Sequence, residues 1–165
     1  MNGLALYQNN LPATVEDLSK FALVGREKLA AVRAEIRAID KLGLAEGVRR
    51  QKLDEAQMIS EAVLDAEVRI GTLTPRIPKN ERVQTDLLPD TAVAQTKTQA
   101  IRALGFTPKQ VERFEKLARY PEVVEQAKAE ARENDDIVSR SLVLEKIKTA
   151  ERAERREAIE TVAPG

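Results

Sequence analysis

Apolar residues recur at alternating steps of three and four through the first half of the chain. One run extends from Leu18 to Ile39 and a second from Ala56 to Leu73, with charged residues between them. This spacing places the apolar side chains along one face of a helix and leaves the charged ones in water. We therefore predict two long helices, the first of which covers residues 15–42.

Local sequence features place the ends of these helices. Thr14 stands three residues before Asp17, which is a capping-box arrangement with Asp in place of the usual Glu. Gly43 follows the first apolar run and favours a left-handed C-terminal cap, and Pro75 and Pro78 close the second run. Two long helices joined by a short turn predict an antiparallel, coiled-coil-like helical hairpin.

The two apolar faces are narrow and rich in alanine, so a hairpin alone would bury little apolar surface. We expect the hairpin to need a partner, either the C-terminal half of the chain or a second copy of it, and a homodimer is the preferred prediction. In the alternative, the two faces pack only on each other within one chain. The residues expected to mediate dimerisation are Leu18, Leu29, Val32, Ile36, Ile39, Ile59, Val63 and Ile70.

Helical periodicity disappears after the hairpin. Three prolines, Pro75, Pro78 and Pro89, interrupt this stretch and predict a linker or an exposed loop. The predicted organisation is a lead-in (1–13), the hairpin (14–74), a linker (75–92), a helix-turn-helix bundle (93–150) and a charged helical tail (151–165).

The C-terminal half begins with the pattern of a helix-turn-helix. Apolar spacing predicts a helix over about residues 93–104, and Gly105 marks a tight turn after it. Thr107 followed by Pro108 predicts the start of a second helix, because Thr caps helix N-termini and Pro fits the first helical position. This helix–turn–helix order is typical of DNA-binding domains.

Two further helices are predicted behind this motif. Pro121 opens a helix that ends near residue 132, and Ser139 or Ser141 caps a last helix, in which Leu142 is expected to face inward. The fold class is therefore all-α, with a long hairpin followed by a helix-turn-helix bundle.

Composition narrows the possible functions. Charged residues make up 33% of the chain and aromatic residues only 3%, which favours long solvated helices over a large compact core. The chain has no Cys and no His, which excludes thiolate catalysis, zinc sites built on these residues and the commonest general base. We expect no enzyme, no catalytic residue, no cofactor and no metal. Without an apolar stretch of membrane-spanning length, a cytoplasmic protein is expected.

Charge is balanced over the whole chain but uneven along it. Residues 94–120 carry six basic and two acidic side chains, and residues 121–136 carry two basic and six acidic ones. A basic helix-turn-helix suits phosphate contacts, and the start of its second helix suits base contacts, in which Gln pairs with adenine and Arg or Lys with guanine. The expected DNA-binding residues are Lys97, Arg102, Thr107, Lys109, Gln110, Arg113 and Lys116.

The segment QAIRALGFTPKQVERFEKLARYPEVVEQAKAEA, followed by SRSLVLEKI, resembles the DNA-binding region of the ParB/KorB partition-protein superfamily. In that family a helix ending in Leu-Gly precedes a Ser or Thr and a recognition helix, and a Leu-Pro-Glu-Val phrase opens the next helix. The corresponding phrase here reads Tyr120-Pro121-Glu122-Val123. The resemblance implies DNA contacts through Thr107, Lys109, Gln110 and Arg113. The family's arginine-rich nucleotide-binding motif is absent, so CTP hydrolysis and DNA clamping are not implied.

The whole chain also resembles small helical proteins encoded by bacteriophages and integrative elements. The leading hypothesis is a non-enzymatic, dimeric DNA-binding protein of a phage or mobile element, which enters the major groove with the helix that starts at Thr107. The alternative is a helical interaction factor, an adaptor or inhibitor of a host or phage protein (for example in anti-defence), that does not touch DNA. The zero net charge and the long apolar faces suit this alternative.

Overall fold

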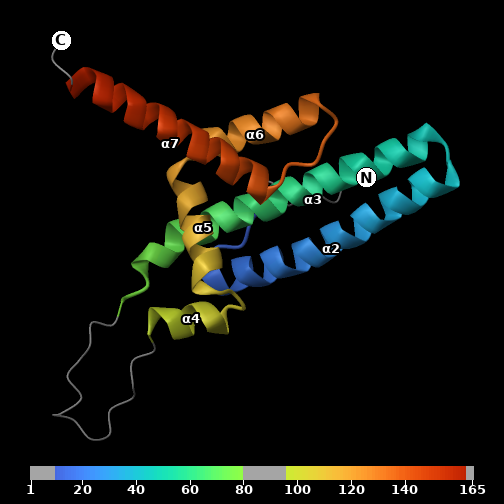
Figure 1. Cartoon of the computed structure of the whole chain (residues 1–165). Coiled ribbons are helices and arrows are strands. Elements are labelled where there is room, and N and C mark those ends of the chain that lie inside the picture. Colours follow the sequence, from blue (N-terminus) through green and yellow to red (C-terminus); the bar gives the residue numbers. More distant parts are fainter. Residues whose placement is uncertain (1–9, 80–95, 163–165) are drawn as a thin grey trace, which may run out of the picture.

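The computed structural model describes residues 10–79 and 96–162, and within these ranges the chain is helical and contains no strand (Figure 1). The all-α prediction is confirmed. The described helices are α2 (Val15–Leu42), α3 (Glu46–Leu73), the short 3₁₀ helix η1 (Thr74–Arg76), α4 (Lys97–Ala103), α5 (Pro108–Arg119), α6 (Pro121–Glu133) and α7 (Arg140–Val162).

Helices α2 and α3 form the antiparallel hairpin that the apolar spacing predicts (Figure 1). The Thr14 hydroxyl accepts a hydrogen bond from the backbone N–H of Asp17 at 3.2 Å, which caps the start of α2. Gly43 ends α2 in the left-handed region at φ 61°, and its N–H donates to the carbonyl of Ile39. Both predicted ends of the first helix are therefore confirmed.

The apolar faces of the hairpin are closed within one chain. Val32, Ala56, Ile59 and Val63 form one buried cluster between α2 and α3, and Leu29 packs on its edge. Five of the eight residues predicted to mediate dimerisation lie in or against this cluster, namely Leu29, Val32, Ile36, Ile59 and Val63. Leu18 and Ile70 are buried in a second cluster of the same chain, and Ile39 is buried as well. A dimer through these side chains would require the hairpin to open, and dimerisation itself stays a prediction.

The C-terminal helices pack on the hairpin. Helix α5 crosses α3 near the open end of the hairpin, and α4 lies near that end (Figure 1). Helices α6 and α7 lie on the side of α3 that faces away from α2. Residues from α2, α3, α4 and α5 share one hydrophobic cluster, which includes Leu18, Ile70, Ile101 and Phe114. The segments predicted as separate units, 14–74 and 93–150, thus share a hydrophobic core.

Helix α3 also anchors its neighbours through carboxylates. Glu61 pairs with Arg132 of α6, and Asp65 pairs with Lys128 of the same helix. Glu61 and Lys128 are each only 4% exposed, so each pair has one partner buried between the helices, whereas the Arg132 side chain is 56% exposed. The carboxylates that stand between the apolar positions of α3 therefore help to position α6. The apolar pattern alone could not indicate this contact.

Three expectations about the C-terminal half need correction or fall outside the described residues. Helix α4 begins at Lys97 and not near residue 93, because Thr96 is extended and forms a capping box with Gln99. Most of the predicted linker lies in residues 80–95, which are outside the described residues. Leu142, expected to face inward, is 41% exposed, whereas its neighbour Val143 is fully buried.

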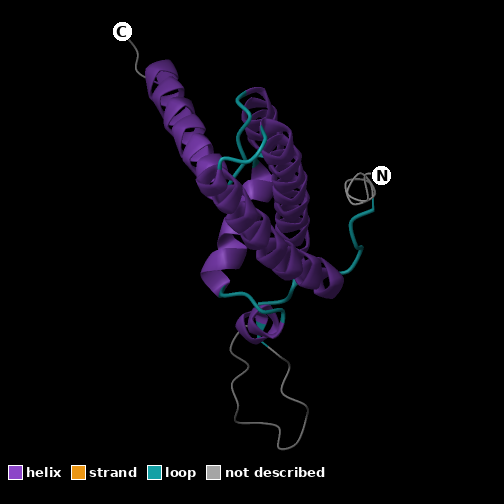
Figure 2. Cartoon of the chain, turned by 90° about the vertical axis from the view of Figure 1, so that its right-hand side faces the viewer, coloured by secondary structure: helices purple, strands orange, loops and turns teal. Residues whose placement is uncertain are grey.

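Helix α7 leaves the body of the protein after its first three turns. Ser139, and not Ser141, caps it by accepting a hydrogen bond from the N–H of Leu142 at 3.2 Å. Residues 152–162 are exposed, and Figures 1 and 2 both show this end of the helix projecting from the other helices. None of the described helices combines the length and the apolar character that crossing a membrane requires.

Candidate nucleic-acid interface

The turn between α4 and α5 is tight and locally determined. Gly105 has φ +90°, a conformation that L side chains rarely adopt, and the following Phe106 is buried. The Thr107 hydroxyl then accepts from the N–H of Gln110 at 3.2 Å, and the Gln110 side chain accepts from the N–H of Thr107 at 2.8 Å. This reciprocal capping box fixes the first residue of α5.

The inner face of α5 is held by aromatic and apolar packing. Val111, Phe114 and Leu117 are buried, and the rings of Phe106 and Phe114 meet edge to face at 5.1 Å between their centroids. The guanidinium of Arg26 lies 5.4 Å from the Phe106 ring centroid and 5.5 Å from that of Phe114. With one face of α5 fixed in this way, the opposite face points to solvent.

Three basic residues lie on that opposite face. Lys109, Arg113 and Lys116, which we call the basic face, follow each other at steps of four and three and so share one side of the helix. Lys109 and Arg113 are exposed, and neither makes an ion pair with any residue that the structure describes. Their positive charges are therefore available to an external anion.

Lys116 is different, because it is already paired. Its Nζ lies 2.9 Å from Glu151 Oε2 of α7, and Glu151 also accepts a hydrogen bond from the Tyr120 hydroxyl at 3.4 Å. The hydrogen bond from Lys116 lowers the pKa of Glu151 below its ordinary value. A phosphate that binds Lys116 would have to replace this carboxylate.

The predicted contacts on α4 also divide into one free and one paired residue. Arg102 is exposed and makes no ion pair among the described residues. Lys97 is only 17% exposed and pairs with Glu115 of α5 at 2.9 Å. Glu115 also accepts a hydrogen bond from the Thr74 hydroxyl at 2.9 Å, so Lys97 belongs to a contact that joins α4, α5 and η1.

The capping box changes the expected roles of Thr107 and Gln110. Adenine recognition by Gln needs its amide oxygen as an acceptor and its amide nitrogen as a donor. In the structure the Gln110 oxygen already accepts from the N–H of Thr107, and the Thr107 hydroxyl is used in the same box. Both residues lie at the start of α5 as predicted, but hydrogen bonds from Gln110 to a base would require the capping box to open.

Of the seven predicted contacts, the structure leaves these three as exposed cations without a described partner: Arg102, Lys109 and Arg113. Sequence reasoning did not identify Arg119, which is exposed at the C-terminal end of α5, as a contact. Its place in the basic segment was visible, but its spacing from the start of the helix gave no reason to select it.

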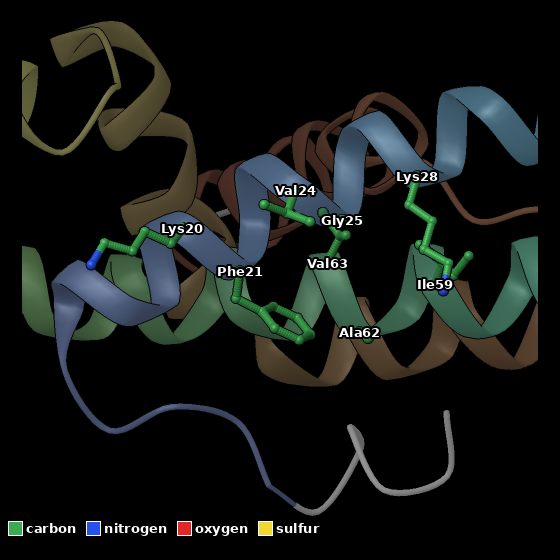
Figure 3. Close-up of a pocket in the computed structure, with 8 residues that line it drawn as sticks. All are labelled: Lys20, Phe21, Val24, Gly25, Lys28, Ile59, Ala62 and Val63. Carbon is green, nitrogen blue, oxygen red and sulfur yellow. The ribbon is translucent and has the colours of Figure 1, made fainter. Parts of the chain in front are cut away.

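A second surface feature lies on the hairpin. An apolar groove of about 300 Å³ runs between α2 and α3, and Figure 3 shows Lys20 and Lys28 at its two ends. Val24, which lines the groove, is 67% exposed. The groove carries no acidic side chain among the residues that line it.

Comparison of the chain with protein-family models, with curated proteins and with solved structures gives no match. The resemblance of residues 99–131 to partition proteins therefore stays a prediction from the sequence.

Proposed function

We propose that the protein binds double-stranded DNA without catalysing a reaction and that it enters the major groove with the solvent-facing side of α5. The observation that carries the proposal is the pair Lys109 and Arg113, exposed one helical turn apart on that side and free of ion pairs among the described residues. Arginine suits guanine edges and phosphate, and lysine suits phosphate.

The packing of α5 supports this orientation. Its inner face is fixed by Phe106 and Phe114, so the helix is presented as a rigid element rather than as a loop. Arg102 at the end of α4 adds a cation beside the turn. We assign phosphate contacts to Arg102 and Lys109 and a phosphate or guanine contact to Arg113. Base reading by Gln110 is not part of the proposal.

We also propose, as the sequence predicts, that the protein comes from a phage or mobile element and acts as a dimer. Two copies of α5 related by a two-fold axis would require half-sites about 10 base pairs apart, or a multiple of this. Because the apolar seam is closed within one chain, the dimer would have to use another surface than the eight predicted residues.

A mobility-shift assay with genomic and random DNA fragments at two salt concentrations tests the proposal. We expect retardation that weakens steeply with salt, because phosphate contacts release counterions. The double variant Lys109→Glu with Arg113→Glu should abolish retardation. The matched control, Arg37→Glu with Lys41→Glu, reverses two exposed charges with the same spacing on α2 and should retain it.

Absence of retardation by the wild-type protein at low salt would exclude DNA binding. Equal loss in the α5 variant and the α2 control would exclude α5 as the contact and would indicate a general charge effect. Circular dichroism of all three proteins establishes that each variant is folded.

The groove on the hairpin favours a second candidate function, that of a protein-interaction factor. Its apolar walls with a lysine at each end fit an amphipathic helix that carries acidic residues beside its apolar face (Figure 3). Fluorescence anisotropy with a labelled Leu/Glu helical peptide should detect this binding, and a Leu/Lys peptide of the same length is the control.

Val24→Glu should abolish binding of the acidic peptide and leave DNA retardation unchanged. Equal affinity for the acidic and basic peptides, or full binding by the Val24→Glu variant, would exclude the groove as the docking site.

A further inference from the structure

A small cavity lies between α2, α3 and the start of α7. Its volume is about 180 Å³, and its lining includes the three arginines Arg26, Arg33 and Arg140 but only one acidic side chain, Glu67. Leu29 and Val63 contribute apolar wall on the hairpin side. We call this feature the arginine cavity.

Two of the arginines share the single carboxylate. Arg26 Nη2 lies 2.5 Å and Arg140 Nη1 lies 3.0 Å from the same oxygen of Glu67, whose side chain is 4% exposed. Arg33 is half-buried and makes no ion pair with any described residue. The cavity therefore holds three positive charges against one negative charge.

The Arg140 guanidinium is affected both by burial and by the charges around it. Burial, and after it the charges of Arg26 and Arg113, lowers the pKa of the Arg140 guanidinium from its ordinary value, while Glu67 opposes the shift. Arg113 belongs to the basic face of α5, so positive charge extends from that face toward the cavity.

The start of α7 lies at the edge of the cavity. The first N–H groups of an α-helix have no partner within the helix, and the α7 N-terminus carries a partial positive charge. Ser139, which caps α7, lines the cavity, so this helix end lies at its edge.

We propose that the arginine cavity binds a phosphate group. Guanidinium groups match phosphate oxygens with paired, charge-assisted hydrogen bonds, and a dianion would balance the two uncompensated charges. A cavity of about 180 Å³ has room for a five-atom phosphate, since one water molecule takes about 30 Å³ in the liquid. Arg33 supplies the guanidinium that is free to bind, and Arg26 and Arg140 are held in place by Glu67 and by the ring of Phe114 in α5. The proposal does not depend on DNA contact by α5.

Thermal unfolding in sodium phosphate, compared with sodium chloride of equal ionic strength, tests the cavity directly. A ligand that binds only the folded state raises the Tm, so we expect a phosphate-specific rise of roughly a few degrees. Arg33→Gln should remove this rise, and Arg33→Lys should keep part of it. Arg37→Gln, one turn further along the exposed surface of α2, should keep all of it.

A wild-type protein whose Tm is the same in phosphate and chloride would overturn the proposal. So would an Arg33→Gln variant that responds like the wild type, or equal losses in the Arg33 and Arg37 variants. Isothermal titration with inorganic phosphate repeats the comparison at constant temperature, which guards against a change in the unfolding mechanism.

Two sources of phosphate can be separated with the same variants. If the ligand is a DNA backbone phosphate, Arg33→Gln should reduce the dependence of log affinity on log salt by about one contact. If the DNA affinity and its salt dependence are unchanged while the response to phosphate is lost, the ligand is free phosphate or a small phosphate ester. The single variant Lys109→Glu, which leaves Arg113 in place, should weaken DNA binding and keep the phosphate response, so failure of DNA binding and failure of the cavity are distinguishable.

Discussion

Gly71 of α3 lies directly against the main chain of Phe114 in α5. A Cβ built on Gly71 would overlap the carbonyl group of Phe114 and would lie 2.6 Å from the backbone nitrogen of Glu115. The two helices cross here with no side chain between them. The position of α5 on the hairpin, and with it the direction of the basic face, therefore depends on a residue without a side chain.

Gly71→Ala should destabilise the protein because main-chain atoms cannot move aside as a flexible side chain can. We expect a loss of about 2–3 kcal/mol in the free energy of unfolding, in the range of overpacked cores. Gly47→Ala on the same helix is the control. Its added Cβ meets no atom within 4 Å, and we expect a gain of about 0.5–1 kcal/mol from helix propensity.

Urea unfolding followed by circular dichroism measures both glycine variants. If the two variants have the same stability, the close approach of Gly71 to α5 does not hold in solution. DNA binding by the Gly71 variant should also fall, because α5 cannot keep its position.

Thr107→Ala should lower the free energy of unfolding by about 1 kcal/mol, the usual cost of losing an N-terminal cap. The reason is that the Thr107 hydroxyl accepts from the N–H of Gln110, and in the variant this N–H keeps only its bond to the backbone carbonyl of Thr107. Thr107→Ser keeps the hydroxyl and should stay close to the wild type. If Ala and Ser give the same stability in urea unfolding, the hydroxyl does not cap α5.

Glu67→Gln should destabilise the protein by about 2–3 kcal/mol, because it leaves Arg26 and Arg140 without their shared carboxylate in a largely buried site. Glu27→Gln, at an exposed position of α2, is the control and should change the stability by less than about 0.5 kcal/mol. Chemical denaturation of the two variants gives the comparison. A Glu67 variant as stable as the control would show that the two arginines do not need this carboxylate.

Because of Lys128, the free energy of unfolding should change with pH in the alkaline range. Burial opposes its charge, but the hydrogen bonds to Asp65 and Glu125 and the negative charges of these two carboxylates together raise its pKa above the ordinary 10.5. A raised folded-state pKa gives stability that is fully present below the unfolded value and is lost as the pH rises through the folded value. The stability difference between wild type and Lys128→Met should therefore be constant up to about pH 10.5 and should shrink above it.

Urea unfolding at a series of pH values measures this difference. Lys109→Met, which removes an exposed and unpaired lysine, should show no such change with pH. A Lys128 difference that grows above pH 10.5 would contradict a pKa of Lys128 raised by Asp65 and Glu125.

Much of the fold is local in origin and was predictable for that reason. Thr14 and Gly43 bound the first helix through hydrogen bonds within one turn, and Thr107 with Pro108 starts α5 in the same way. Val111 and Phe114 stand three residues apart in the sequence and are both buried on the inner face of α5. Caps and amphipathic faces depend on neighbours three or four residues away, so the sequence displays them directly.

The candidate site was predictable only in part. The sequence identified the basic segment, but it could not distinguish the free Lys109 from Lys97 and Lys116, whose acidic partners Glu115 and Glu151 lie 18 and 35 residues away. The capping role of Gln110 is local and could have been recognised from its place three residues after Thr107.

The sequence by itself determined an all-helical chain, the hairpin, and the start of α5, because these follow from hydrogen bonds and apolar spacing within a few turns. Only the tertiary structure decided that the hairpin seam closes within one chain and that α5 rests on Gly71. It also decided that Arg26, Arg33 and Arg140 meet around one carboxylate. The physical reason is that these contacts join residues on different helices, and their pairing depends on how the helices cross rather than on any spacing along the chain.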